Sequence, residues 1–229
     1  MYLRLKKEVC RVNKALAKNG LVLLTWGNAS VIDRKKKVIA IKPSGISFDK
    51  LTPADIVILD LKGNVIDGKK NPSTDAPTHV VLYESFPQVQ SIIHTHSKYA
   101  TSFAQAGVPI RSFGTTHADH FNGTIPVTRK LSKKEIDNYE LNTGIAIAET
   151  FKKLDPSEMP ACLVVSHGPF IWGKNSEEAL ENAVILEEIA HMSLNTLHIN
   201  PTQKDISTHL LNKHYTRKHG TNAYYGQKK

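Results

Sequence analysis

Two histidines separated by one residue, His94 and His96, have a spacing that points to metal chemistry. They follow the apolar run 91–93, which predicts a short buried strand. Because side chains alternate between the two faces of a strand, imidazoles two residues apart project from the same face. Two neutral imidazole nitrogens on one face are half of a tetrahedral or five-coordinate zinc site. In a chain with eleven histidines, a solvated strand end is the alternative interpretation.

Two further polar residues stand where a metal ligand is expected. His167 lies in a glycine-proline turn, 166–169, between two apolar runs, where a core histidine would be badly placed. Asp75 ends the polar loop 71–75, directly before a predicted helix. An aspartate there is also typical of a helix N-cap, and for Asp75 taken alone that interpretation is the stronger one. Together with the histidine pair, these residues form a candidate set of metal ligands.

Three short polar loops have the composition of phosphate-binding turns. Gly27-Asn28 follows one apolar run, and Lys42-Pro43-Ser44-Gly45 follows another. The second loop offers an ammonium, a hydroxyl and an open backbone N–H. Ser73-Thr74 directly precedes a helix N-terminus, which favours an anion. Each loop taken alone is also compatible with an ordinary turn.

Groups that bind oxygen or transfer protons gather at two other places. The segment 114–120 contains Thr115 and Asp119 and is compatible with a helix cap or a surface loop as well as with a site. Basic and phenolic side chains near the C-terminus are His214, Arg217, Tyr224 and Tyr225. A disordered tail without a function seldom carries aromatic residues, so the C-terminal segment is a candidate part of the site.

These residues need a framework, and the apolar spacing predicts one of interleaved helices and strands. Helices are predicted at 3–19, 78–86, 97–107, 132–153, 175–195 and 205–218. Strands are predicted at 21–32, 38–41, 56–61, 65–66, 91–93, 161–165 and 170–172, with a hairpin turn at 62–64. No repeats or long linkers interrupt this order, so the sequence predicts a single mixed α/β domain over residues 1–229.

Composition narrows the function classes. The 229 residues are 40% hydrophobic and 22% charged, typical of a globular chain with a sizeable core. The two cysteines, Cys10 and Cys162, are too far apart for a Cys-x-x-Cys motif and fit a reducing cytosol. The sequence has no recognisable signal peptide and no apolar run of membrane-spanning length. We therefore expect a cytoplasmic protein with no membrane partner.

The net charge of +9 raises the question of nucleic acid binding. The basic run 34–37 lies between two strand-like runs, as in a solvated hairpin turn, and no recognition-helix, zinc-finger or RNP-like pattern accompanies it. We expect no nucleic acid partner, because a basic funnel for a phosphorylated metabolite accounts better for the charge. None of the thirteen glycines forms a Gly-x-Gly pair, which argues against a nicotinamide-dependent reaction.

Taken in order, these loops resemble the class II aldolase/adducin superfamily, and within it the L-ribulose-5-phosphate 4-epimerase branch. The similarity runs nearly end to end and is carried by the stretches 24–28, 41–45, 93–97, 114–119, 166–170, 213–220 and 224–227. The resemblance implies a single three-layer αβα domain with a central mixed, largely antiparallel sheet. It also implies that the C-terminal segment, about 205–229, completes the active site.

Matched position by position, the resemblance implies a role for individual residues. The implied metal ligands are Asp75, His94, His96 and His167. The implied substrate and phosphate contacts are Gly27, Asn28, Ser44, Gly45, Ser73 and Thr74, with Lys42, Thr115, His214 and Arg217 assisting. The implied acid–base pair is Asp119 and Tyr225. Thr74 departs from the serine that is usual in the family, but it keeps the hydroxyl and the backbone N–H, so we expect little change.

The implied reaction interconverts L-ribulose 5-phosphate and D-xylulose 5-phosphate by cleaving the C3–C4 bond and re-forming it on the opposite aldehyde face. Zinc is the implied cofactor, and manganese or cobalt would also suit an Asp/His site. Related proteins form tetramers with the site between subunits, so the resemblance implies a homotetramer.

Two alternatives remain open at this stage. The first is a class II aldolase acting on a related sugar phosphate; fuculose-phosphate-type aldolases carry glutamate at the position of Asp75, so the shorter aspartate favours the epimerase. The second is a metal-free, adducin-like interaction module on the same fold. Arabinose catabolism, ascorbate use and related pentose routes all employ such an epimerase, and the sequence does not choose among them.

Overall fold

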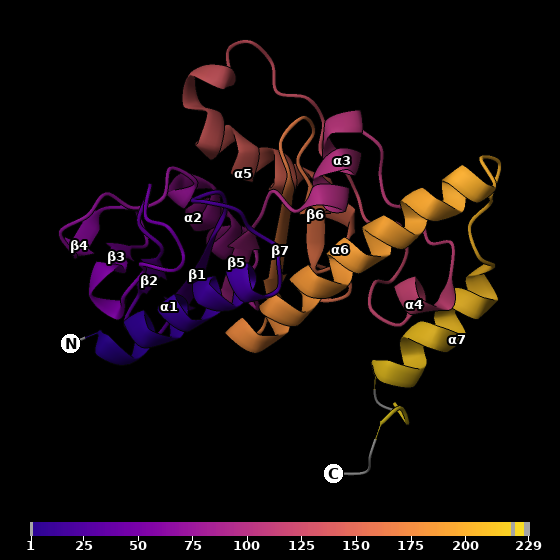
Figure 1. Ribbon diagram of the computed structural model, residues 1–229, viewed down its shortest axis with the longest axis horizontal. Coiled ribbons are helices and arrows are strands. Elements are labelled where there is room, and N and C mark those ends of the chain that lie inside the picture. Colours follow the sequence, from indigo (N-terminus) through magenta and orange to yellow (C-terminus); the bar gives the residue numbers. More distant parts are fainter. Residues whose placement is uncertain (1, 221–222, 227–229) are drawn as a thin grey trace.

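The computed structural model describes residues 2–220 and 223–226, and the chain forms a seven-stranded sheet between two layers of helices (Figure 1). The strands are β1 (Asn28–Asp33), β2 (Val38–Ile41), β3 (Val57–Asp60), β4 (Val65–Asp67), β5 (Ser91–His94), β6 (Ala161–Leu163) and β7 (Pro169–Gly173). Their order in the sheet is β4-β3-β2-β1-β5-β7-β6, and all neighbouring pairs are antiparallel. An isolated parallel bridge joins Val127 to Leu163. The predicted largely antiparallel α/β fold is confirmed.

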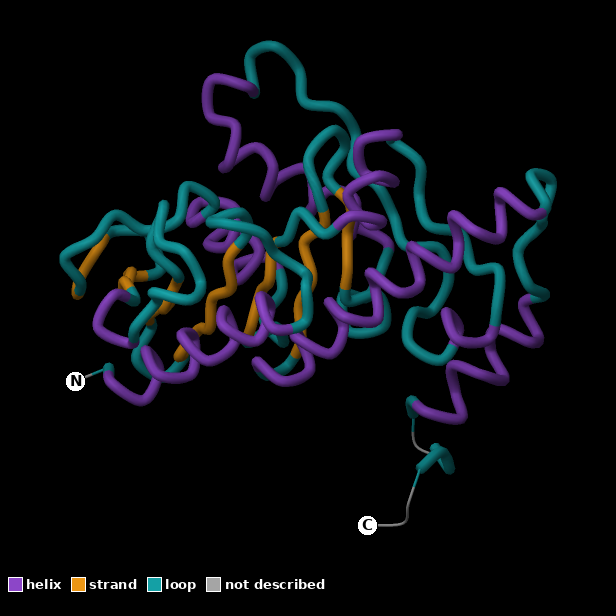
Figure 2. Tube along the Cα trace, in the orientation of Figure 1, coloured by secondary structure: helices purple, strands orange, loops and turns teal. Residues whose placement is uncertain are grey.

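The helices divide between the two faces of the sheet (Figure 2). They are α1 (Leu3–Lys18), α2 (Ala76–Ser85), α3 (Lys98–Ala106), α4 (Thr115–Ala118), α5 (Tyr139–Thr150), α6 (Ser176–Ile199) and α7 (Thr208–Lys218), with short 3-10 turns at Pro53–Asp55, Ile136–Asn138 and Phe151–Lys153. Helices α1 and α6 pack on one face with α3 beside α6, and α2 and α5 pack together on the other. Helices α4 and α7 contact each other at the lower right of Figure 1. No helix in the described part of the chain is long and apolar enough to span a lipid bilayer.

Successive side chains of the central strands point to opposite faces of the sheet and pack into the hydrophobic core on both sides. Val31 of β1 packs with Val9 and Cys10 of α1, whereas its neighbour Ile32 belongs to the cluster that contains Leu82 of α2. A strand buried on both faces reads as a continuous apolar run rather than an alternating one. The same alternation places Asn28 and Ser30 on the α2 face, where the polar residues of the site are found.

Most predicted elements are present, and two differ in a way that matters for the site. The strand predicted at 21–32 begins only at Asn28, because Leu24 and Gly27 adopt left-handed backbone conformations (φ +50° and +87°) that end an extended run. The helix predicted at 132–153 begins at Tyr139. Glu135 accepts a hydrogen bond from the backbone N–H of Ser132, as in one half of a helix capping box. Arg129 binds the same carboxylate and holds it in the loop before the helix.

Candidate metal centre

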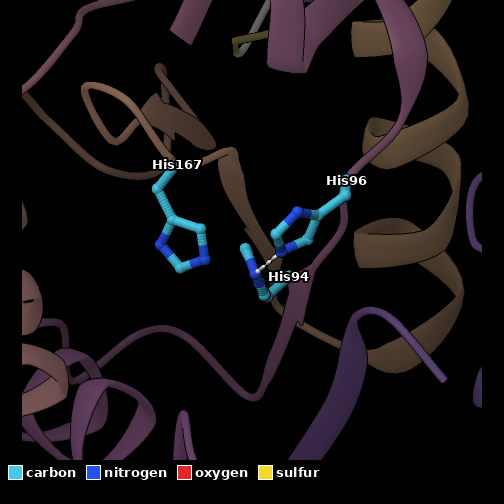
Figure 3. Close-up of side chains that lie close together, drawn as sticks. All are labelled: His94, His96 and His167. Carbon is cyan, nitrogen blue, oxygen red and sulfur yellow. Dashed lines mark hydrogen bonds between the residues drawn. The ribbon is translucent and has the colours of Figure 1, made fainter. Parts of the chain in front are cut away.

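Three histidines converge at one end of the sheet. His94 ends β5, His96 lies two residues beyond, and His167 comes from the turn between β6 and β7 (Figure 3). One nitrogen from each ring lies within 4.8 Å of the others. The Nε2 atoms of His94 and His96 are 3.0 Å apart, close to the roughly 3.3 Å between two nitrogens bound tetrahedrally to one zinc ion. The prediction that both imidazoles project to the same side is confirmed, although β5 ends at His94 and His96 lies just beyond it.

Two glycines allow the chain segments to approach closely enough for this arrangement. A Cβ on Gly27 would lie 2.6 Å from the carbonyl oxygen of His94, and a Cβ on Gly168 would lie 2.6 Å from that of Thr95. Either contact is closer than a side chain tolerates, so both positions require glycine. The loop before β1 and the turn after β6 therefore pack directly on the histidine segment.

The histidines are in the protonation state that a metal requires. Nδ1 of His94 lies 3.0 Å from the carbonyl oxygen of Pro169, and because a carbonyl only accepts, Nδ1 carries the proton and Nε2 presents its lone pair. Burial lowers the pKa of His94 to about 3, and burial also lowers the pKa values of His96 and His167. All three rings are neutral near pH 7, as metal ligands must be.

Asp75 lies beside the histidines and is held by the strand opposite. It occupies the N-cap position of α2, but its side chain makes no capping hydrogen bond. Its Oδ2 instead accepts from Nδ2 of Asn28 at 2.7 Å and from the hydroxyl of Ser73 at 3.4 Å. Burial acts to raise the pKa of Asp75, but the nearby histidines, His94 foremost, and the Asn28 amide outweigh it and hold the pKa below its usual range. The carboxylate is therefore ionised.

The residues fit a divalent metal on two observations. First, ligand atoms of His94, His96 and His167 all lie within 4.8 Å of one another. The predicted fourth ligand, Asp75, is outside this group, but its carboxylate interacts electrostatically with His94 and His167. Second, the buried Nδ1 of His167 has no hydrogen-bond partner in the described part of the chain, so that ring is not committed to the protein. Neutral imidazoles with a neighbouring carboxylate are a donor set that zinc accepts.

The three predicted phosphate loops lie side by side next to Asp75. Nδ2 of Asn28 donates to Oγ of Ser73 at 3.0 Å. The backbone N–H of Ser73 donates to the carbonyl of Lys42 at 3.0 Å, and the N–H of Ser44 donates to the carbonyl of Asn71 at 3.1 Å. A cavity of about 400 Å³ opens against Ser73 and Thr74. The structure thus brings together loops that are distant in the sequence.

Lys42 is a buried cation within these loops. Its side chain is 1% exposed, its Nζ donates to the carbonyl of Pro43 at 3.3 Å, and the ammonium lies 4.7 Å from the centroid of the Phe48 ring. Burial lowers the pKa of Lys42 to about 8 because the charged form loses its hydration. An anion bound at the loops would compensate this charge.

Asp119 is held by the side chains of α7. The guanidinium of Arg217 donates from Nε to Oδ1 at 2.8 Å and from Nη2 to Oδ2 at 2.5 Å, and Nδ1 of His214 lies 3.1 Å from Oδ1. Burial acts to raise the pKa of Asp119, but these two partners outweigh it and hold the pKa below its usual range. The carboxylate is therefore an ionised proton acceptor. Thr115, at the start of α4, lies one helical turn before it.

Tyr225 joins the same cluster through Arg217. The backbone N–H groups of Tyr224 and Tyr225 both donate to the carbonyl of Arg217, at 2.9 and 3.0 Å. The Tyr225 ring lies 5.0 Å from the Arg217 guanidinium and 4.5 Å from the Lys218 ammonium, and the residue is 60% exposed. The acid–base residues implied by the resemblance are therefore neighbours.

The predicted residues form two clusters, which lie apart in one chain. The predicted metal and phosphate residues lie at β5, the β6–β7 turn, the start of β1, and the loops that follow β2 and precede α2, all within the part of Figure 1 that contains the sheet. Asp119 and Tyr225 belong to the region of α4 and α7 at the lower right of that figure.

Sequence reasoning missed the aromatic rings around the histidines. Phe170 stacks on His94 with ring centroids 4.3 Å apart, and the Tyr139 ring lies 5.7 Å from that of His167. Phe170 lies in the stretch 166–170 that carries the family resemblance, and this stretch could have indicated that Phe170 is near the histidines. Nothing in the sequence pointed to Tyr139, because it lay inside a helix predicted to begin seven residues earlier.

Comparison with known proteins extends over nearly the whole chain. The sequence model of the family described as "Class II Aldolase and Adducin N-terminal domain" matches residues 7–194. The chain is 47% identical over 226 residues to a Salmonella paratyphi B protein named L-ribulose-5-phosphate 4-epimerase UlaF, covering 98% of this chain and 99% of that protein.

Solved structures show the same fold. An L-fuculose 1-phosphate aldolase superposes with a TM-score of 0.81 at 24% identity, covering 93% of this chain and 95% of the other. The L-fuculose 1-phosphate aldolase of Glaciozyma antarctica superposes with a TM-score of 0.76 at 20% identity, covering 96% and 84%. The fold is therefore shared with enzymes whose names denote aldol cleavage of a sugar phosphate.

Proposed function

The chain belongs to the class II aldolase and adducin family, and from this we propose that it is a metal-dependent L-ribulose-5-phosphate 4-epimerase. The observation that carries the proposal is the convergence of His94, His96 and His167 beside the phosphate loops. The similarity to a protein named for this activity, 47% identity over nearly the full length of both chains, supports the choice of substrate. The proposed reaction is reversible: it converts L-ribulose 5-phosphate to D-xylulose 5-phosphate and back.

In this proposal His94, His96, His167 and Asp75 hold one divalent metal ion, with zinc preferred and manganese or cobalt accepted. When bound, the metal supplies Lewis acidity to the substrate carbonyl. The carbonyl of Pro169 orients the His94 ring, and the amide of Asn28 orients the carboxylate of Asp75. These contacts restrain the ligands before the metal binds.

The position of the reacting carbon determines the type of reaction. C4 of a 2-ketopentose is not adjacent to the carbonyl, so removing its hydrogen as a proton gives no stabilised anion. Cleaving the C3–C4 bond instead sends its electron pair toward C2, while the C4 hydroxyl loses its proton to a base and becomes an aldehyde. The aldehyde fragment then turns over and re-forms the bond on its other face, while Asn28, Ser44, Ser73 and Thr74 keep its phosphate in place, assisted by Lys42 and the backbone of Gly27 and Gly45.

Asp119 and Tyr225 are the proposed proton carriers at the C4 oxygen, one for each face of the aldehyde. Asp119 is ionised and accepts a proton, and a phenol donates one. His214 and Arg217 hold the Asp119 carboxylate in place, and we propose that they and Thr115 also contact the substrate.

Because these residues lie apart from the metal centre of their own chain, we propose that a second copy supplies them, in a homotetramer with its active sites between subunits. Exposed apolar side chains in the loop before β1, which approaches His96 through Trp26, support this arrangement. Leu23, Leu24 and Trp26 are 57%, 74% and 51% exposed, and the Trp26 ring lies 6.4 Å from that of His96. Exposed apolar patches of this kind mark contacts with another molecule.

The proposed setting is the cytoplasm, in carbohydrate metabolism. Cys10 and Cys162 are both buried and unpaired, which fits a reducing compartment. Arabinose catabolism is a route that requires this interconversion.

The proposal is tested by incubating the protein with L-ribulose 5-phosphate and determining the stereochemistry of the product. We expect D-xylulose 5-phosphate to appear without free glycolaldehyde phosphate. Accumulation of free aldehyde would instead identify an aldolase, and a protein that neither turns over the sugar nor binds metal would be the adducin-like interaction module.

We expect unphosphorylated L-ribulose to react orders of magnitude more slowly than the phosphate ester, since binding of the remote phosphate orients the reacting carbon. The difference in kcat/KM between the two sugars should shrink above about pH 8. There the buried Lys42 loses its proton, and with it its attraction for the phosphate. The measurement is kcat/KM against pH for both sugars, because this ratio reports the free enzyme.

The Lys42→Met variant should lack this pH step, and Lys35→Met, at an exposed position in the β1–β2 turn, should keep it. Equal kcat/KM values for the two sugars would contradict the phosphate site.

A further inference from the structure

A row of polar side chains on α2 faces a row on β1. Asp75, His79 and Tyr83 are spaced four residues apart and therefore lie on one face of the helix. Asn28 and Ser30 alternate along β1 and share one face of the strand. Asn28 binds Asp75, while Ser30 binds both His79 and Tyr83. The metal-centre carboxylate thus belongs to a continuous polar contact between a helix and a strand.

The inner part of this contact is completely enclosed. Ser30 and His79 are 0% exposed and Tyr83 is 2% exposed. Oγ of Ser30 lies 2.7 Å from Nδ1 of His79 and 2.8 Å from the phenolic oxygen of Tyr83. Burial lowers the pKa of His79 to about 4, so the ring is neutral and carries a single proton. Its Nε2 has no hydrogen-bond partner among the described residues.

The donors and acceptors available to Tyr83, Ser30 and His79 decide the direction in which their hydrogen bonds run. If Tyr83 donates to Ser30 and Ser30 donates to Nδ1 of His79, both hydroxyl protons have acceptors and the proton of His79 lies on Nε2. In the opposite direction the buried Tyr83 proton has no acceptor among the described residues, and a lone pair replaces the Nε2–H in the field of the Asp75 carboxylate. Each direction leaves one buried proton without an acceptor among the described residues: the Nε2–H of His79 in the first and the hydroxyl proton of Tyr83 in the second. The negative charge of Asp75 stabilises an Nε2–H and opposes a lone pair there, so the first direction is favoured.

His79 is also linked to a second member of the metal centre. Its ring meets Phe170 edge-on, with centroids 5.9 Å apart and an interplanar angle of 67°. Phe170 stacks in turn on His94, with centroids 4.3 Å apart and an angle of 18°. A change in the orientation of His79 would therefore affect both the Asp75 carboxylate and His94, the most buried of the three histidines of the metal centre.

We propose that Tyr83, Ser30 and His79 form a buried relay that positions the metal centre, with His79 presenting an Nε2–H dipole that stabilises the ionised Asp75. These are positioning residues that act through Asp75 and His94. The inference rests on the metal centre in the proposed function. It adds three residues that are neither proposed metal ligands nor proposed substrate contacts. Outer partners of metal ligands typically contribute 10- to 100-fold to metal affinity.

The test compares Ser30→Ala with Ser91→Ala in the full chain. Ser91 is a matched control: it is equally buried, and its hydroxyl donates to the backbone carbonyl of Ser30 at 2.9 Å without taking part in the relay. Metal-free protein is titrated with Co²⁺, and the visible spectrum reports both affinity and ligand geometry. We expect Ser30→Ala to bind Co²⁺ roughly 10-fold more weakly or worse, with an altered spectrum. Ser91→Ala should match the wild type in both.

Two further measurements keep the test decisive if Ser30→Ala does not fold. Tyr83→Phe preserves the ring and removes only the first donor, so it should weaken Co²⁺ binding in the same direction by a smaller factor. Nitrogen-15 NMR of the wild-type imidazoles should show His79 with its proton on Nε2.

The inference is overturned if folded Ser30→Ala or Tyr83→Phe binds Co²⁺ like the wild type, or if the proton of His79 lies on Nδ1. A wild-type protein that binds no metal would instead remove the proposed function itself.

Discussion

Removing the metal should abolish turnover, and restoring zinc or manganese should recover it. We expect about one divalent ion per purified chain, because three neutral histidines converge on a single position and the ionised Asp75 carboxylate interacts with them electrostatically. The expected loss is complete, since without a Lewis acid nothing stabilises the negative charge released by C3–C4 cleavage. Metal content by mass spectrometry and turnover of L-ribulose 5-phosphate are measured on the same samples before and after chelation.

A pair of histidine variants separates metal loss from a general effect of mutation. His96→Asn should lose both bound metal and activity. His198→Asn, at an exposed position on α6, should keep both. Full activity in a demonstrably metal-free sample would end the hypothesis.

Tyr225→Phe and Asp119→Asn should each lower kcat by roughly 10² or more while leaving metal content unchanged. Inverting C4 requires its oxygen to lose a proton in one position and gain one in another, which a single side chain cannot easily do. Tyr224→Phe is the matched control for the phenol, because the Tyr224 ring faces Lys213 rather than Arg217 and Lys218. Rates close to wild type in either main variant would remove that residue from the mechanism.

Mixing the inactive proteins tests whether the site lies between chains. Asp119 and Tyr225 are linked through Arg217 in one chain, so both belong to the same cluster. A metal-site variant such as His96→Asn, mixed with Tyr225→Phe, should therefore regain partial activity, because some sites would combine an intact metal centre with an intact cluster from another chain. Verified subunit exchange without recovery would place the metal centre and the cluster on one chain.

The same geometry makes a mixture of Asp119→Asn and Tyr225→Phe informative. If one chain contributes both residues to a site, this mixture should stay inactive, since no site then contains both intact groups. Recovery in it would show that Asp119 and Tyr225 reach a site from different chains.

Local features of the site could be predicted from the sequence because they depend on neighbours along the chain. The two-residue period of a strand placed His94 and His96 on one side, and their Nε2 atoms lie 3.0 Å apart. Outside the site, the helix predicted at 175–195 is present as α6, because Asn175 caps it locally by accepting from the N–H of Glu178 at 2.8 Å.

The role of Asp75 depended on the tertiary structure. Its sequence position before a helix favoured an N-cap, yet its carboxylate turns away from the helix N–H groups toward Asn28, which lies 47 positions away in the chain. A carboxylate follows the strongest available donors, and the donors at that point come from β1 once β1 and α2 have packed together.

The composition of the site was decided by the order of the strands. His167 reaches His94 because β7 pairs with β5, so that His94 lies opposite Phe170 in the sheet, although more than seventy residues separate them. The same folding leaves Asp119 and Tyr225 with α4 and α7, apart from the histidines. The sequence by itself therefore determined which side chains could do chemistry and which way neighbouring ones point. Which of them meet was decided by the tertiary structure, because contacts between distant residues depend on strand pairing and helix packing, which no local pattern encodes.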